Sequence, residues 1–456
     1  MLALFIACQN TPVEQLKPSL LTGQISNVED AAALLMIGDK SDTLALDSLG
    51  QFMHEFNLYD PALLTIRLDR NRKLIFMMPG SDLEVTIDAA SFYDSISFAG
   101  SLATENMIMN DYENRDGGSM RELHSLPFDS FHMENDLLMD EALKFVQEAS
   151  AEKTVVPEFT DFLTTKIKAS WASNKLNYPS YHKYFAKLDE KPEMPEGYYN
   201  FLDAIDINNP VYHSIRQVES FTESLIYRKT DELHKDSSYS DDDHELLLRF
   251  DAVDSILNNQ ALNEKFKFNM LNDAIKYSGP DNLEVVLTIF RNKVGKQEYQ
   301  QEIDEAYAKW ENLVKGSPAP DFIAHDMDGK EYHLADFLGK YVYIDVWATW
   351  CGPCRTEIPY LKEVEHEFHD NNIAFISISV DKQKDYDKWK TMVIEEELGG
   401  YQLFAPNDWK SEIASNYLVR SIPRFILIDM DGNILNVSAE RPSGKIRDVI
   451  AALPGV

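Results

Sequence analysis

One short stretch constrains the fold of this chain more than any other: residues 347–355, with the sequence WATWCGPCR. It closes an apolar run, Tyr341 to Val346, and opens an amphipathic pattern, so the two cysteines are expected one turn apart at the start of a helix. Unsatisfied N–H groups and the positive end of the helix dipole favour a thiolate there, lowering a cysteine pKa from about 8.5 to about 7 or below. Cys351 is therefore predicted to be a nucleophile, and Cys354 is placed to attack the mixed disulfide that Cys351 forms.

Length and charge exclude some classes of protein. At 456 residues the chain is too long for one ordinary core, and two or three domains are expected. The formal net charge is −33 at pH 7, whereas a nucleic-acid surface needs basic residues that face phosphates. The composition therefore argues against nucleic acid as a partner and predicts a solvated acidic surface.

The spacing of apolar residues divides the chain into regions. Residues 20–100 contain short apolar runs at roughly ten-residue spacing, bounded by turn residues, which predicts a small β-sandwich. In residues 101–315 apolar positions recur at helical spacing, and antiparallel helices are expected. The segment 315–320, KGSPAP, cannot continue a helix, so a new domain is predicted over residues 316–456.

The last predicted domain has a recognisable order of elements. The run Tyr341 to Trp347, the helix that carries the cysteines and the run Ile373 to Val380 predict a βαβ unit with two parallel strands. A hairpin is expected next, with strands at Phe425 to Ile428 and Ile434 to Val437, and then a final helix. This order predicts an α/β domain.

Cys8 is the remaining cysteine of three. It follows a short apolar run, Leu2 to Ala7, and resembles the lipidated cysteine at the end of a bacterial lipoprotein signal, so residues 1–19 are predicted to be a signal remnant and tether. No Lys or Arg precedes the run, so either the start codon lies upstream of Met1 or the resemblance is accidental and Cys8 is a buried or incidental cysteine. The sequence contains no run of about 20 apolar residues, so no membrane-spanning helix is predicted.

Further motifs agree with the cysteine pair: residues 319–322 (APDF), Glu357 just after the cysteines, and residues 419–425 (VRSIPRF) before a strand. Together they resemble the thioredoxin fold in its TlpA/ResA-like branch of periplasmic thiol-disulfide oxidoreductases. Residues 47–52 and 79–82 resemble the β-rich N-terminal module that many Bacteroidota place before such domains. The expected fold class is multidomain α+β, with an N-terminal β-sandwich-like module, a central helical region and a C-terminal thioredoxin-fold α/β domain.

The resemblance assigns roles to residues around the cysteines. Asp345 stands in an otherwise apolar strand and matches the buried acid of thioredoxins. Burial raises the pKa of such a carboxyl group, which then takes the proton of Cys354; a strand-end carboxylate that reaches solvent is the alternative. Pro423 matches the family's cis-proline, and the backbone at Ile422 is expected to pair with an extended substrate segment.

Supporting roles are expected for six residues: Trp350, Gly352, Pro353, Glu357, Ile422 and Arg424. Many thioredoxins have a buried lysine near the acid, where this chain has Ser377, which predicts different proton handling at Asp345. Arg424 stands where the family has threonine. It is expected to stabilise the Cys351 thiolate or to bind an acidic client, with a solvated side chain as the alternative. Glu357 either tunes the cysteines or is a surface carboxylate.

Zinc is the alternative use of the cysteines, because Cys351, Cys354, His366 and His369 come close to a zinc-finger spacing. The two histidines lie near the far end of the predicted helix, roughly 20 Å from the thiols at about 1.5 Å per residue, which opposes a shared metal. We therefore expect no metal, and no cofactor beyond a redox-active Cys351–Cys354 disulfide.

These features predict a thiol-disulfide oxidoreductase of the cell envelope, periplasmic and anchored by a lipid on Cys8. Cys351 attacks a disulfide of a client protein, Cys354 resolves it, and the family implies re-reduction by a membrane thiol donor of the DsbD/CcdA type. The Gly352-Pro353 dipeptide resembles reducing thioredoxins near about −270 mV more than oxidants near about −120 mV, which predicts a reductase. The alternative is a binding or scaffold protein whose first 315 residues carry the function, with the thioredoxin-like domain as a docking module.

Overall fold

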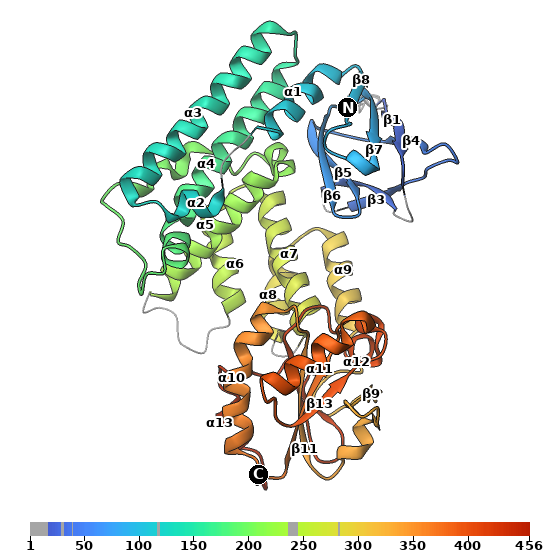
Figure 1. The fold of residues 1–456 in the computed structure, drawn as a ribbon. Helices are drawn as coiled ribbons and strands as arrows, with labels where there is room; N and C mark the ends of the chain where they lie inside the picture. The colour runs from blue at the N-terminus through green and yellow to red at the C-terminus, as the bar shows by residue number, and fades with distance from the viewer. Residues whose placement is uncertain (1–16, 29–31, 39, 116–118, 236–244, 281–282) are drawn as a thin grey trace, which may run out of the picture. The chain divides into compact units, whose positions relative to one another are not determined.

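The computed structural model describes residues 17–28, 32–38, 40–115, 119–235, 245–280 and 283–456 (Figure 1). The chain divides into two compact units, Met1–Asn263 and Glu264–Val456. The division falls inside one helix, α7, which spans Gln260–Ser278. The linker predicted at residues 315–320 lies within the second unit, between helix α9 and strand β9.

The first unit begins with eight strands in two sheets. The sheets have the orders β4-β1-β7-β8 and β3-β2-β5-β6. Alternate residues of β7 are buried, which is the two-residue period expected of a strand with one face in a core. Side chains of both sheets join one hydrophobic cluster, which confirms the predicted sandwich-like module. The strands are β1 (Ser19–Ser26), β2 (Ala33–Ile37), β3 (Lys40–Leu44), β4 (Gln51–Phe56), β5 (Ala62–Leu68), β6 (Asn71–Met77), β7 (Asp82–Asp88) and β8 (Ser97–Gly100).

Helices follow, as the spacing of apolar residues predicts. Helix α3 packs on α4, α4 on α5, and α5 on α6, so that sequence neighbours are also neighbours in space. Ser119 caps α2 by accepting the N–H of Glu122, and Pro157 is the first residue of α4, where its missing N–H has no partner to lose. The helices of this unit are α1 (Ala103–Glu113), α2 (Met120–Ser125), α3 (Phe128–Glu152), α4 (Pro157–Phe185), α5 (Arg216–His234) and α6 (Glu245–Ile256).

The second unit contains α7, α8 (Glu284–Lys293) and α9 (Gln297–Ala308), followed by a sheet of seven strands in the order β10-β9-β13-β12-β11-β14-β15. The central strand β11 pairs in parallel with β12 and antiparallel with β14. All seven residues of β11 are buried, as expected for a strand that is covered on both faces. The strands are β9 (Ala324–His325), β10 (Glu331–Tyr332), β11 (Tyr341–Trp347), β12 (Ile373–Ser379), β13 (Tyr401–Phe404), β14 (Arg424–Ile428) and β15 (Ile434–Asn436).

Helices cover both faces of this sheet. One hydrophobic cluster joins the sheet to α10 (Gly352–Glu367) and α13 (Ile446–Ala451), and a second joins it to α11 (Tyr386–Glu395) and α12 (Glu412–Asn416). Tyr341 and Tyr343 of β11 belong to the first cluster. Because residues two apart in a strand share a face, Asp345 also points toward the α10 side.

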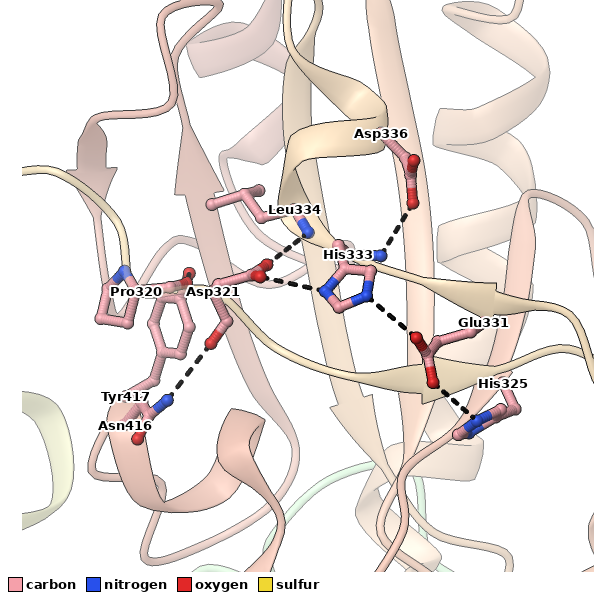
Figure 2. A network of polar contacts seen from close by, with 9 residues as sticks. All are labelled: Pro320, Asp321, His325, Glu331, His333, Leu334, Asp336, Asn416 and Tyr417. Atoms are coloured by element: carbon pink, nitrogen blue, oxygen red, sulfur yellow. Dashed lines mark hydrogen bonds and ion pairs between the residues drawn. The ribbon is translucent and has the colours of Figure 1, made fainter.

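A polar network holds the start of this domain in place and explains the aspartate of the APDF motif (Figure 2). The Asp321 carboxylate accepts the backbone N–H of Leu334 at 2.8 Å, and its other oxygen lies 3.0 Å from His333 Nδ1. The Tyr417 hydroxyl donates to the Pro320 carbonyl, and the Asn416 amide donates to the Asp321 carbonyl at 3.2 Å. The segment is thereby tied both to the loop before β11 and to the end of α12.

Candidate active site

The two cysteines sit where β11 turns into α10. Cys351 is the N-cap residue, and its Sγ accepts the backbone N–H of Cys354 at 3.1 Å, a donor that the helix itself leaves unsatisfied. Sγ of Cys351 is bonded to Sγ of Cys354, with Cα atoms 5.3 Å apart. Both side chains are buried, at 4% and 3% exposure, whereas the adjacent Trp350 is 55% exposed. The two sulfur atoms therefore lie just beneath the protein surface, next to the exposed side chain of Trp350.

Asp381 holds the loop before the cysteines, and sequence reasoning missed it. Its carboxylate accepts the backbone N–H of Thr349 at 2.8 Å and the Thr349 hydroxyl at 2.9 Å. The Ser379 hydroxyl donates to the same carboxylate at 2.8 Å, and Asp381 is fully buried. A carboxylate directly after the apolar run of β12 was the available signal, because an ionised group in such a place requires strong hydrogen-bond donors.

The proline loop approaches the same edge of the sheet. The Ile422–Pro423 peptide bond is cis. The next residue, Arg424, pairs with Val346 in the β14–β11 register, so Pro423 lies at the end of β14 where β11 leaves toward Cys351. Ile422 packs against the hydrophobic cluster that contains both cysteines. The sheet therefore brings this loop and the cysteine pair together, although about 70 residues separate them in sequence.

Asp345 is buried behind the cysteines, at 8% exposure, so the alternative of a carboxylate that reaches solvent is wrong. Burial raises the pKa of its carboxyl group well above the ordinary value, and the nearby Glu365 and Glu357 raise it further. Its strand neighbour is Ser377, and its Oδ1 has no hydrogen-bond partner among the described residues. This arrangement favours the protonated form of Asp345.

Glu357 and Arg424 are both buried, at 7% and 4% exposure, so their surface alternatives are wrong. Glu357 accepts the Ser443 backbone N–H at 3.0 Å and the Ser443 hydroxyl at 2.9 Å. Arg424 donates through Nη1 to the Val437 carbonyl at 3.2 Å and through Nη2 to the Tyr277 carbonyl at the end of α7. Burial lowers the pKa of Arg424 to about 10. Both residues anchor backbone near the site, and their predicted effects on the Cys351 thiolate or on clients stay predictions.

Three remaining observations concern Cys8, metal ligands and membrane helices. Cys8 lies outside the described residues. Within the described ranges, no group of three or more His, Cys, Asp or Glu side chains is arranged to hold a metal ion. In the same part of the chain, no helix combines the length and the apolar character needed to cross a bilayer.

Comparison with known proteins identifies the family. The Redoxin family model matches residues 314–453. A thiol-disulfide oxidoreductase ResA of Bacillus cereus is 31% identical over 153 residues, which is 33% of this chain and 82% of that protein. The chain belongs to the ResA family of thiol-disulfide oxidoreductases. The ResA of Bacillus subtilis is 28% identical over 29% of this chain and 70% of its own length.

Among solved structures, the chain is similar to the thioredoxin domain of a thiol-disulfide oxidoreductase from Bacteroides vulgatus. The identity is 29%, the match covers 30% of this chain and 96% of that chain, and the TM-score is 0.28. The Redoxin match covers the part of the chain that holds the cysteine pair. The chain is thus an enzyme of the protein-disulfide-reductase class, with a thioredoxin-type C-terminal domain. The residues before position 314 lie outside the family match.

Proposed function

We propose that the protein reduces disulfide bonds of client proteins in the cell envelope. The observation that carries this proposal is the Cys351–Cys354 pair at the start of α10, with a cis-proline loop at the same sheet edge and a buried acid, Asp345, behind it. In the reduced protein the Cys351 thiolate attacks a client disulfide and forms a mixed disulfide. Cys354 then attacks Cys351, which releases the client with both of its sulfurs reduced.

The surroundings of the pair support each part of this cycle. The N-terminus of α10 stabilises negative charge on Cys351, because its N–H groups and dipole point at that position. The exposed Trp350 ring offers a client an apolar contact beside the buried sulfurs. By family resemblance, the Ile422 backbone beside the cis-proline pairs with an extended client segment. In its ionised form, Asp345 receives the proton that Cys354 must lose before it attacks.

The resemblance to the periplasmic branch of the family supports a proposal on partners and location. We place the protein in the periplasm, where a membrane thiol donor of the DsbD/CcdA type would return two electrons to the Cys351–Cys354 disulfide. A lipid on Cys8 would hold it at a membrane. Mass spectrometry of the N-terminal peptide of the protein from the native host tests the lipid, and an unmodified Cys8 would refute it.

Trapping of clients tests the function itself. In a Cys354→Ser variant the mixed disulfide on Cys351 cannot be resolved, so client proteins should stay covalently attached and separate only on reduction. The matched control is the double variant Cys351→Ser, Cys354→Ser, which should retain none. If Cys351→Ser leaves the phenotype and the binding of partners unchanged and Cys354→Ser traps nothing, the first 315 residues carry the function and the domain is a docking module.

The direction of electron flow needs a separate measurement. Equilibration of the Cys351–Cys354 pair with glutathione buffers should give a reduction potential near about −270 mV, as in reducing thioredoxins. A potential near about −120 mV, typical of strong oxidants, would overturn the reductase assignment while leaving the exchange chemistry intact.

A further inference from the structure

A small cavity lies beside Asp345, under the middle of α10. The centre of a water molecule can occupy a volume of about 10 Å³ in this cavity. This volume is close to the minimum that one bound water needs. Asp345 of β11, Ser377 of β12, Gln402 of β13 and Glu365 of α10 line it. Polar side chains from three adjacent strands and one helix therefore surround a space the size of one water molecule.

Two of these groups have atoms without hydrogen-bond partners. Oδ1 of Asp345 and Oε1 of Gln402 are buried and bond to nothing in the described part of the chain. The two side chains are 8% and 9% exposed, and an unsatisfied buried oxygen costs about 1–3 kcal/mol. Native proteins usually satisfy such atoms with ordered water, and a water here has several acceptors around it.

Glu365 is the second acid of the cavity. The chain leaves room for its carboxylate at Gly399 and Gly400: a Cβ on Gly399 would lie 2.3 Å from Glu365 Oε2, and one on Gly400 would lie 3.0 Å from Oε1. Burial raises the pKa of Glu365 to about 7, while Lys362 on the same helix opposes this rise. Lys362 itself donates to the Glu396 carbonyl.

We propose that Glu365 is a positioning residue for the exchange reaction: it and Asp345 share one proton through a single water bound in this cavity. The proposal rests on the proposed function of the Cys351–Cys354 pair. The charged groups around Glu365 are Asp345 from β11 and Lys362 from α10, with the neutral Ser377 and Gln402 contributed by β12 and β13. Glu357, also on α10, adds its charge at Asp345.

The proton balance of the resolving step defines the role. Cys354 gives its proton to the acid pair, and its thiolate attacks Cys351 Sγ in the mixed disulfide. The Cys351–Cys354 bond forms, the bond from Cys351 to the client breaks, and the client sulfur leaves as a thiolate that takes up a proton. Two electrons thus pass from the dithiol to the client disulfide. With Glu365 beside it, Asp345 can pass the proton on through the water and is then ionised again for the next cycle.

Two readouts on the full chain test the proposal, with Glu365→Gln as the variant and Glu367→Gln as control. Glu367 lies on the same helix, is exposed and faces Arg447. The first readout is an infrared titration of protonated carboxyl groups in the oxidised protein, which needs no turnover. Wild type and Glu367→Gln should show two coupled carboxyl groups titrating above the ordinary range. Glu365→Gln should lose one of them and shift the other to lower pH.

The second readout is rapid mixing of the reduced protein with an aromatic disulfide that releases a coloured thiol twice. The first release reports attack by Cys351 and the second reports resolution by Cys354. Glu365→Gln should slow only the second release, by about tenfold or more near neutral pH, and Glu365→Asp, which keeps the carboxylate, should restore much of the rate. A Glu365→Gln variant that matches Glu367→Gln in both readouts overturns the proposal. No release dependent on Cys351 would instead overturn the proposed function and leave the infrared result to stand.

Discussion

The pH dependence of stability gives a quantitative test of the half-buried Glu365. Its pKa is raised from 4.5 to about 7 in the folded protein, mainly by burial. The folded state then binds more protons than the unfolded chain between these two values, so the free energy of unfolding falls as pH rises through this window. Each tenfold change in proton affinity corresponds to about 1.4 kcal/mol, which gives a cost of about 3 kcal/mol at pH 8 relative to pH 4.

Glu365→Gln removes the titrating group and therefore this cost. The unfolding free energy of the variant minus that of the wild type should therefore increase by about 3 kcal/mol from pH 4 to pH 8. Denaturant unfolding followed by tryptophan fluorescence measures it, because five of the six tryptophans lie after residue 263 and report on the second unit. Midpoint and slope must be fitted together, since a changed slope would indicate a loss of two-state behaviour.

Glu367→Gln, exposed on the same helix, should show no such trend and serves as the control. A constant difference between Glu365→Gln and the wild type across pH 4 to 8 would refute the reasoning, because it would mean that Glu365 titrates alike in the folded and unfolded states.

Three other substitutions test single contacts. Asp381→Ala removes the acceptor of the loop before the cysteines and should cost about 3 kcal/mol in unfolding free energy, with slower thiol-disulfide exchange measured by insulin reduction. Ser443→Ala removes one hydrogen bond to the buried Glu357 and should cost about 1 kcal/mol in the same denaturant assay; a neutral result would show that the backbone N–H alone suffices. His333→Gln should lower the thermal midpoint at pH 6 but not at pH 9. Hydrogen bonds to Asp321, and then to Glu331, raise the pKa of His333 in the folded protein. The protonated ring therefore stabilises the fold fully below about pH 6.5, and this stabilisation is lost as the pH rises above the pKa of the folded state.

The cysteine pair, the central strand and the buried Asp345 could be predicted because each is encoded locally. The apolar run of β11 fixes a buried strand, an acid inside it must be buried as well, and two cysteines after it begin a helix. Sandwich strands and helices were also predictable from period alone. These features depend on residues within a few positions of one another, where side-chain periodicity is informative.

Glu365 could not be predicted, because its environment comes from distant parts of the chain. Glu365 lies in a helix rich in charged residues, and its helical spacing from Ile358 and Leu361 gives only a weak local signal. It is set apart only by the approach of Gly399 and Gly400, which tertiary packing decides. Likewise, the burial of Arg424 depends on the carbonyl of Tyr277, far away in sequence.

The presence of Ser377 where many thioredoxins have a buried lysine has a physical consequence for Asp345. Many thioredoxins place a buried lysine there, whereas this chain has Ser377 next to Asp345 in the sheet. An ionised Asp345 beside the Ser377 hydroxyl and the Gln402 amide would be poorly stabilised, because Lys362 at the same cavity donates to the Glu396 carbonyl. A second carboxyl group changes the problem, because two acids that share one proton through a water carry a single negative charge spread over both sites. Glu365 thereby allows this family member to keep a proton acceptor behind its cysteines without a buried cation.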